Sequence, residues 1–200
     1  MNEYNMKKPV LSCWLIFAIL ILVHGFEAVV LRMDETVFGE NFINKVFGIL
    51  VIFIVLKIMR WKWTDIGFAN TGFIKSVCIG LVLAVGSFTI SYTVESIILR
   101  SQGHDISFGV FTTGFSLTGG SEIHTGIGFI LVCIFFNVIN VIMEEGTFRG
   151  LFYELVRAEY SRKYALLFQA FLFGIWHIVT PLHNLFDGDI NGVSFIGLGI

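Results

Sequence analysis

Two carboxylates, a guanidinium and an imidazole lie where apolar residues dominate this sequence. Glu144, Glu145 and Arg149 follow an unbroken apolar run that begins at Ile127, and His177 lies within another such run. Ionisable side chains in a membrane helix are costly unless they are paired or hydrated, so each one indicates a functional site. A carboxylate among apolar side chains suits a general base that acts on water, and an imidazole can orient that water or stabilise developing charge. Hydrolysis of a peptide bond beneath the membrane surface is one reaction that these residue types could perform.

The positions of Glu144 and His177 predict that they lie at one depth. A charged turn from residue 157 to residue 163 separates the two apolar runs, and the helices on either side of it should be antiparallel. Glu144 lies 13 residues before Arg157, and His177 lies 14 residues after Lys163. At about 1.5 Å per residue, both would lie roughly 20 Å from the turn. A carboxylate and an imidazole at the same depth on neighbouring helices can share a water molecule.

Two further pairs have the four-residue spacing of a single helix face. Glu145 and Arg149 can form an ion pair that lowers the burial cost of both and holds Glu144 in position. Phe173 precedes His177 by four residues, which places an aromatic ring one turn from the imidazole. The same residues also fit a proton relay, a substrate-transport site or a purely structural ion pair. An imidazole at this position also fits the membrane interface.

Other hydrolytic chemistry has weaker support in the sequence. No H-E-x-x-H helix occurs, and Glu144, Glu145 and His177 supply at most three zinc ligands. Gly120 and Ser121 lie in a polar loop without an evident partner base, which disfavours a serine nucleophile. We therefore expect neither a metal nor another cofactor.

The composition indicates an integral membrane protein. Of 200 residues, 56% are hydrophobic and 14% are charged, against about 25% charged in a soluble domain, and the mean hydropathy is +0.82. The formal net charge of −2 provides no basic face for nucleic acid. The expected partners are membrane lipid and a membrane-associated substrate. The three cysteines share no ligand-like spacing and are predicted to be free thiols.

Apolar stretches of about 20 residues, the length needed to cross a bilayer, define the predicted architecture. We predict an all-α polytopic transmembrane bundle, a single membrane domain over residues 1–200, with five complete spans and a partial sixth. The sixth begins at Val193 and is still apolar at Ile200, so we expect a truncated chain. The segment Ser101–Thr125 is predicted to be a loop. The five spans are predicted at Val10–Val30, Phe42–Met59, Phe73–Leu99, Ile127 to beyond Met143, and about Ala165–Val179.

Basic residues predict the orientation of the spans. Ten Lys and Arg residues lie on one set of loops and span ends, and three lie on the opposite set. Since basic residues concentrate on the cytoplasmic side, the amino terminus and the loop around residue 160 are predicted to be cytoplasmic. Two other carboxylates, Glu27 and Glu95, lie near span ends and are predicted to be solvated there. The three residues on the poorer side are Arg32, Lys45 and Arg100.

Two short motifs in these runs resemble a known family. The run Glu144-Glu145-Gly146-Thr147-Phe148-Arg149-Gly150 resembles the first motif of the CAAX-protease and bacteriocin-processing family, two glutamates with an arginine four residues after the second. The run Phe173-Gly174-Ile175-Trp176-His177 looks like its second motif. The region similar to the family's peptidase core covers about residues 127–200.

The resemblance implies a metal-independent intramembrane glutamate peptidase in a bacterial plasma membrane. Glu144 would activate the attacking water with help from His177, Glu145 and Arg149 would support the site, and Phe173 would pack beside it. The alternative is a non-catalytic membrane scaffold or bacteriocin self-immunity protein of the same family.

One element of the family pattern is missing. The family has a third motif, a histidine followed four residues later by Asn or Asp. His183 and Asp187 have that spacing but come soon after His177 in an expected loop, so we interpret the match as coincidental. The third motif is expected beyond Ile200.

Overall fold

Helices form throughout the part of the chain that the computed structural model describes, residues 8–32, 42–69, 71–106 and 127–179 with residues 182 and 185. Within these ranges no strand occurs, which confirms the all-α prediction. The chain divides into two compact units, one of residues 69–111 and one that combines residues 1–68 with 112–200. The single membrane domain stays a prediction.

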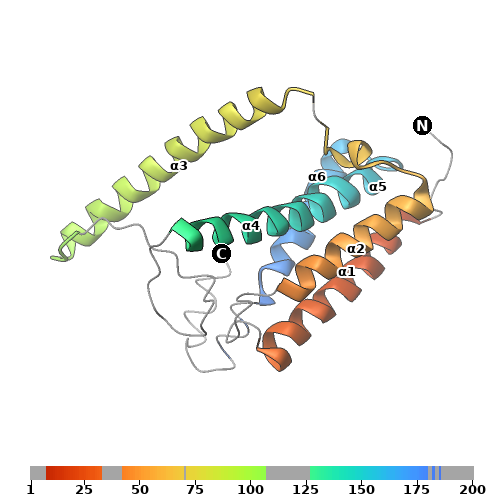
Figure 1. The fold of residues 1–200 in the computed structure, drawn as a ribbon, viewed down its shortest axis with the longest axis horizontal. Coiled ribbons are helices and arrows are strands. Elements are labelled where there is room, and N and C mark those ends of the chain that lie inside the picture. The colour runs from red at the N-terminus through yellow and green to blue at the C-terminus, as the bar shows by residue number, and fades with distance from the viewer. Residues whose placement is uncertain are drawn as a thin grey trace. The chain divides into compact units, whose positions relative to one another are not determined.

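The helix boundaries agree closely with the predicted spans (Figure 1). Three helices are long and apolar enough to cross a membrane, Pro9–Leu31, Phe42–Met59 and Phe73–Ser101. The full count of five spans and a partial sixth stays a prediction, and the segment from Val193 lies outside the described residues. The elements are α1 (Pro9–Phe26), the π-helix η1 (Glu27–Leu31), α2 (Phe42–Met59), the 3₁₀-helix η3 (Trp63–Ile66), α3 (Phe73–Ser101), α4 (Ile127–Glu144), the π-helix η4 (Glu145–Phe152), α5 (Tyr153–Arg157) and α6 (Arg162–Trp176).

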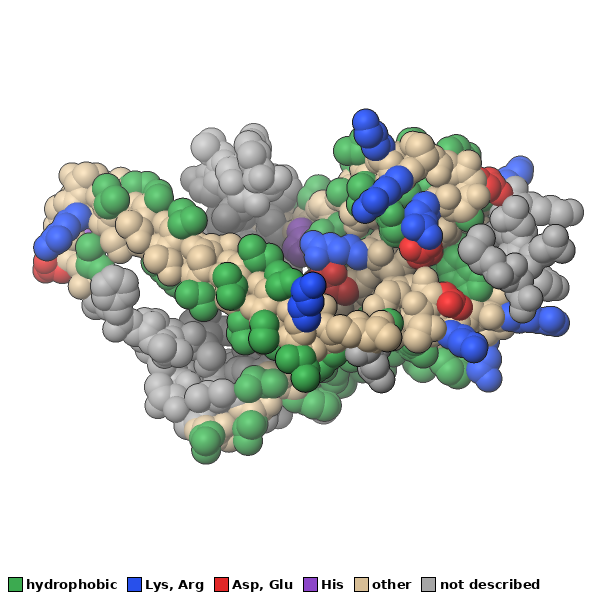
Figure 2. Space-filling model, turned by 90° about the horizontal axis from the view of Figure 1, so that it is seen from above, with side chains coloured by type: hydrophobic (Ala, Val, Ile, Leu, Met, Phe, Trp, Pro, Cys, Tyr) green, Lys and Arg blue, Asp and Glu red, His purple; other side chains and the backbone are tan. Residues whose placement is uncertain are grey.

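Large apolar side chains cover the outside of these helices as well as their contacts. Leu22 of α1 is 71% exposed and Ile58 of α2 is 63% exposed, and Figure 2 shows hydrophobic side chains spread over the face it presents. A soluble monomer rarely exposes so much contiguous apolar surface. Lipid is the environment that solvates such helices, so the structure agrees with an integral membrane protein.

Three basic chain segments of the larger unit meet at one end. The start of α1, the end of α2 and the turn between α5 and α6 lie together at the upper right of Figure 1. Ser161 forms that turn by capping α6, where its hydroxyl accepts a hydrogen bond from the Tyr164 amide at 3.3 Å. The segments carry Lys8, Lys57, Arg60, Lys62, Arg157, Arg162 and Lys163. Seven of the ten basic residues that the sequence assigns to the cytoplasmic side thus belong to segments at one end, and the orientation stays a prediction.

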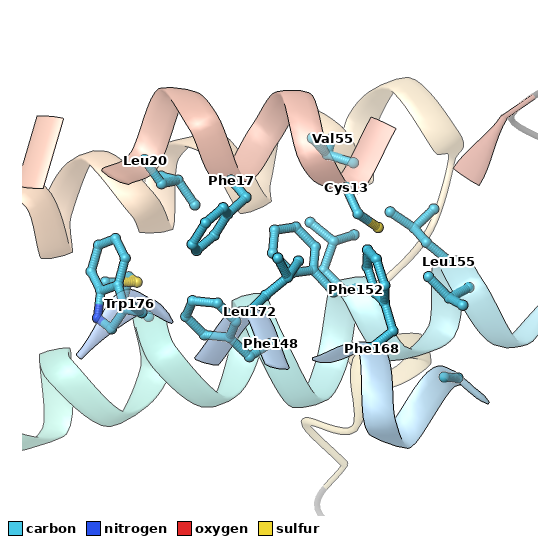
Figure 3. Packing of buried hydrophobic residues seen from close by; sticks show 14 of the residues in the cluster. Cys13, Phe17, Leu20, Val55, Phe148, Phe152, Leu155, Phe168, Leu172 and Trp176 are labelled. Carbon is cyan, nitrogen blue, oxygen red and sulfur yellow. The ribbon is translucent and has the colours of Figure 1, made fainter. Parts of the chain in front are cut away.

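A cluster of aromatic and aliphatic side chains fills the space between α1, η4 and α6 (Figure 3). Phe148 of η4 lies at its centre, with ring centroids 6.2 Å from Phe17, 5.5 Å from Phe152 and 5.9 Å from Trp176. These edge-on and tilted contacts are the arrangements that aromatic rings favour. The cluster holds η4 against α6 and so places the residues of the first motif beside those of the second.

Two glycines of η4 permit close approach of the segment that follows α2. A Cβ added at Gly146 would lie 3.2 Å from the Phe68 ring. A Cβ added at Gly150 would lie 2.6 Å from the carbonyl oxygen of Ile66 and 3.1 Å from its Cβ. Since a backbone oxygen cannot rotate away, Gly150 is required where η3 packs on η4.

The Glu27 carboxylate caps the start of α2. Its oxygens accept hydrogen bonds from the amides of Ile43 at 2.7 Å and Asn44 at 2.6 Å, and the side chain is only 1% exposed. The prediction of a solvated helix end was therefore wrong for Glu27. The physical reason is that the first amides of a helix lack internal partners and favour a negative charge, so a carboxylate can be satisfied there without water. Glu95 is exposed on α3.

We expect Gly150→Ala to destabilise the fold by about 1 to 3 kcal/mol, the usual cost of overpacking a filled site. Thermal unfolding in detergent measures the change. Gly25→Ala is the matched control, because a Cβ at Gly25 meets nothing within 4 Å. Equal midpoints for both variants would contradict the tight contact between η3 and η4.

We expect Glu27→Ala to destabilise the fold by about 2 kcal/mol or more, because a part-buried and a buried amide of α2 lose their acceptors. Thermal unfolding in detergent again gives the measurement. Glu159→Ala removes an exposed carboxylate and serves as the control. A midpoint for Glu27→Ala equal to that of the control would show that the cap contributes no stability.

Candidate active site

Glu144 lies where α4 passes into η4, and a cation from α2 contacts its carboxylate. The Lys45 ammonium lies 2.8 Å from Glu144 Oε1, and each side chain is only 14% exposed. Such a pair compensates the cost that either charge would carry alone in apolar surroundings. It also joins the first turn of α2 to the end of α4, two helices that pack against each other.

Trp176 of α6 contacts the same carboxylate. Its indole Nε1 donates to Glu144 Oε1 at 3.2 Å, and the Lys45 ammonium lies 5.4 Å from the centre of its ring. Beneath the indole lies His24 of α1, with ring centroids 4.2 Å apart and the rings tilted by 35°. His24 is 4% exposed, and neither ring nitrogen has a hydrogen-bond partner among the described residues. Four helices thus contribute polar side chains at the level of Glu144.

The second carboxylate of the first motif forms the predicted ion pair. Arg149 Nη1 lies 2.9 Å from both oxygens of Glu145, four residues earlier. The two side chains are 60% and 37% exposed, so water screens part of the attraction. The guanidinium also lies 5.7 Å from the centre of the Phe173 ring. Arg149 therefore connects the first motif to the phenylalanine of the second.

The second motif has the predicted contact between its aromatic ring and its imidazole. The rings of Phe173 and His177 meet edge to face with centroids 4.5 Å apart. His177 Nδ1 lies 2.9 Å from the Phe173 carbonyl oxygen. Because a carbonyl only accepts, Nδ1 donates this hydrogen bond, and in the neutral ring Nε2 keeps its lone pair.

Glu144 and the second motif meet in the structure. The indole that contacts Glu144 belongs to Trp176, the residue directly before His177. The Glu144 carboxylate contacts Lys45 and Trp176, and the His177 imidazole contacts the Phe173 carbonyl. The structure therefore places Glu144 near the second motif, while the catalytic roles stay a prediction. His183 and Asp187 lie outside the described residues.

Sequence reasoning missed three residues at this level, Lys45, Trp176 and His24. Lys45 was counted only as a charge at a span end. The spacing of both residues from the basic end carries a signal, because Lys45 lies 15 residues before Arg60 and His24 lies 16 residues after Lys8. At about 1.5 Å per residue, both are again over 20 Å from the basic end.

No cluster of three or more His, Cys, Asp or Glu side chains is placed to hold a metal ion within the described ranges. Cys13 is buried in the aromatic cluster and Cys78 lies exposed on α3, and both are free thiols, as predicted.

The carboxyl-terminal part of the chain matches one known family. Residues 126–200 match the family model described as type II CAAX prenyl endopeptidase Rce1-like. No curated protein and no solved structure matches the chain. The matched segment contains both motifs, with Glu144, Glu145, Arg149, Phe173 and His177. Residues 126–200 are therefore similar to the Rce1-like CAAX prenyl endopeptidases, and the match confirms the family resemblance that the two motifs predicted.

Proposed function

We propose that the chain is a metal-independent intramembrane endopeptidase in which the Glu144 carboxylate activates water. The family match supports an activity of the CAAX-protease type. The observation that carries the proposal is a mostly buried carboxylate, contacted on one oxygen by Lys45 and Trp176, beside the histidine-bearing end of α6. The substrate would be a peptide bond of a membrane-associated peptide or protein.

The reaction follows from the atoms of the two motifs. A water molecule between the helices donates one hydrogen bond to Glu144 Oε2 and another to His177 Nε2, which leaves a lone pair of its oxygen for the substrate carbonyl carbon. As the carbon–oxygen bond forms, the first proton passes to Glu144. The same proton then passes to the departing amide nitrogen as the carbon–nitrogen bond breaks. The remaining proton of the new carboxylic acid then passes to the released amine, so the products are a carboxylate and an ammonium group, and Glu144 returns to its starting state.

The supporting residues act on position rather than on the reacting atoms. The Phe173 carbonyl fixes the tautomer of His177, and the Phe173 ring limits the rotation of the imidazole. Arg149 contacts that ring while it pairs with Glu145, so it helps to fix the position of one motif relative to the other. We propose access from the cytoplasmic side of a bacterial plasma membrane, with the amino terminus cytoplasmic.

A non-catalytic scaffold or bacteriocin self-immunity protein of the same family is the second candidate. The Lys45–Glu144 pair favours it, because an ion pair between two helices also serves a purely structural role. The two functions differ in whether the Glu144 carboxylate must react or merely remain paired.

We expect peptide cleavage by the native chain in detergent, unaffected by a strong chelator. Glu144→Ala and His177→Ala should each lower kcat by about two to four orders of magnitude, since they remove the base and the group that orients the water. Release of a fluorogenic peptide measures the rate, with Glu159→Ala as an exposed control.

Each protein is first checked for an unfolding midpoint close to that of the native chain. Full cleavage by either folded variant would contradict the assigned role, and loss of cleavage with the chelator would contradict the metal-independent mechanism. No cleavage by a folded native chain would favour the scaffold.

A further inference from the structure

We propose that Lys45 is a positioning residue that keeps Glu144 ionised and directs one carboxylate oxygen toward the reacting water. The inference deepens the proposed function and rests on it for the catalytic consequence. Its physical basis is the contact between the Lys45 ammonium and Glu144 Oε1 at 2.8 Å. Lys45 belongs to α2, outside the segment that matches the family model.

Both donors to Glu144 contact the same oxygen. The Lys45 ammonium and the Trp176 indole converge on Oε1, at 2.8 and 3.2 Å. Two donors from different helices fix the rotation of the carboxylate, because a turn of the group would break both contacts. Oε2 is thereby directed to the other side of the carboxylate, where it can accept a proton from water.

The burial of the pair makes its charge state depend on Lys45. With both side chains 14% exposed, an uncompensated carboxylate would favour its neutral form. A neutral carboxyl group cannot accept the proton of the attacking water. An opposite charge within about 4 to 6 Å favours the ionised form by a factor of roughly ten to a thousand. Lys45 supplies that charge at the shortest distance.

Hydrogen bonds to the first turn of α2 fix the backbone next to Lys45. Glu27 binds the amides of Ile43 and Asn44, the residues directly before Lys45 in the first turn of α2. The ammonium is further held over the Trp176 ring. The lysine therefore reaches Glu144 from an anchored backbone rather than from a loose helix end.

Other charged groups near this level have different partners. Arg149 pairs with Glu145 and is 60% exposed, and Glu27 is bound to the amides of α2. The titratable or charged groups that the surrounding elements carry near this level are His24 of α1, Glu27 of η1, Lys45 of α2, Glu145 and Arg149 of η4, and His177 beside α6.

The test measures the charge state of Glu144 without any cleavage. Dicyclohexylcarbodiimide is an apolar reagent that reacts with protonated carboxyl groups, and mass spectrometry of the digested protein locates the adduct. At neutral pH we expect Glu144 to be modified about tenfold faster or more in Lys45→Met than in the native chain. Lys45→Arg keeps the positive charge and should restore slow modification.

Three controls make the result specific. Modification of Glu145 in the same sample should not change, because its partner is Arg149. Lys57→Met removes an exposed lysine from the other end of α2 and should leave the labelling of Glu144 at the native rate. Lys45→Gln keeps a hydrogen-bond donor without the charge, and it replaces Lys45→Met if that variant does not fold.

In the cleavage assay, Lys45→Met should lower kcat about tenfold or more at neutral pH with little change in KM. A Glu144 labelling rate that does not change in folded Lys45→Met and Lys45→Gln would overturn the proposal. Faster labelling of Glu144 in Lys45→Met, together with a folded native chain that cleaves no peptide, would support the control of charge by Lys45 and reject the peptidase function.

Discussion

The ion pair between Lys45 and Glu144 is the interaction on which the arrangement of the bundle depends. In an apolar environment a charge must be paired, and a pair between two helices fixes their relative level. The pair joins α2 to α4, and the indole of Trp176 adds α6 to the same carboxylate. His24 brings α1 to this level by stacking on the indole. One carboxylate thus determines where four helices meet.

Apolar packing brings the helices close enough for this ion pair to form. Phe148 fills the space between α1 and α6, and Gly150 lets η3 lie directly against η4. The wider turn of η4 begins at Glu145, so consecutive glutamates lie at the change from an α-helix to a π-helix. Such π-helical turns are rare and often occur at functional sites. The first motif therefore contains both the two carboxylates and the glycines that allow neighbouring segments to pack closely against η4.

The parts of the fold that depend on local sequence could be predicted, and the parts that depend on distant partners could not. Apolar run lengths gave the start of α2 at Phe42 and of α3 at Phe73, and helix spacing gave the pair of Glu145 with Arg149. The partner of Glu144 lies 99 residues away in the chain, so no local period reveals it. Glu27 was misinterpreted for the same reason, since its partners are the amides of α2.

A general base inside a membrane has two requirements that conflict. It must be ionised, which calls for a neighbouring cation, and it must keep an oxygen accessible to water, which a cation on both oxygens would prevent. The contacts that the described residues make with Glu144 reconcile the two, because Lys45 and Trp176 both lie on Oε1 and compensate the charge on that side of the carboxylate. The same geometry explains why a lysine anchored outside the matched segment belongs to the site. In the proposed mechanism the two motifs provide the reacting groups, and α2 provides the positive charge beside one of them.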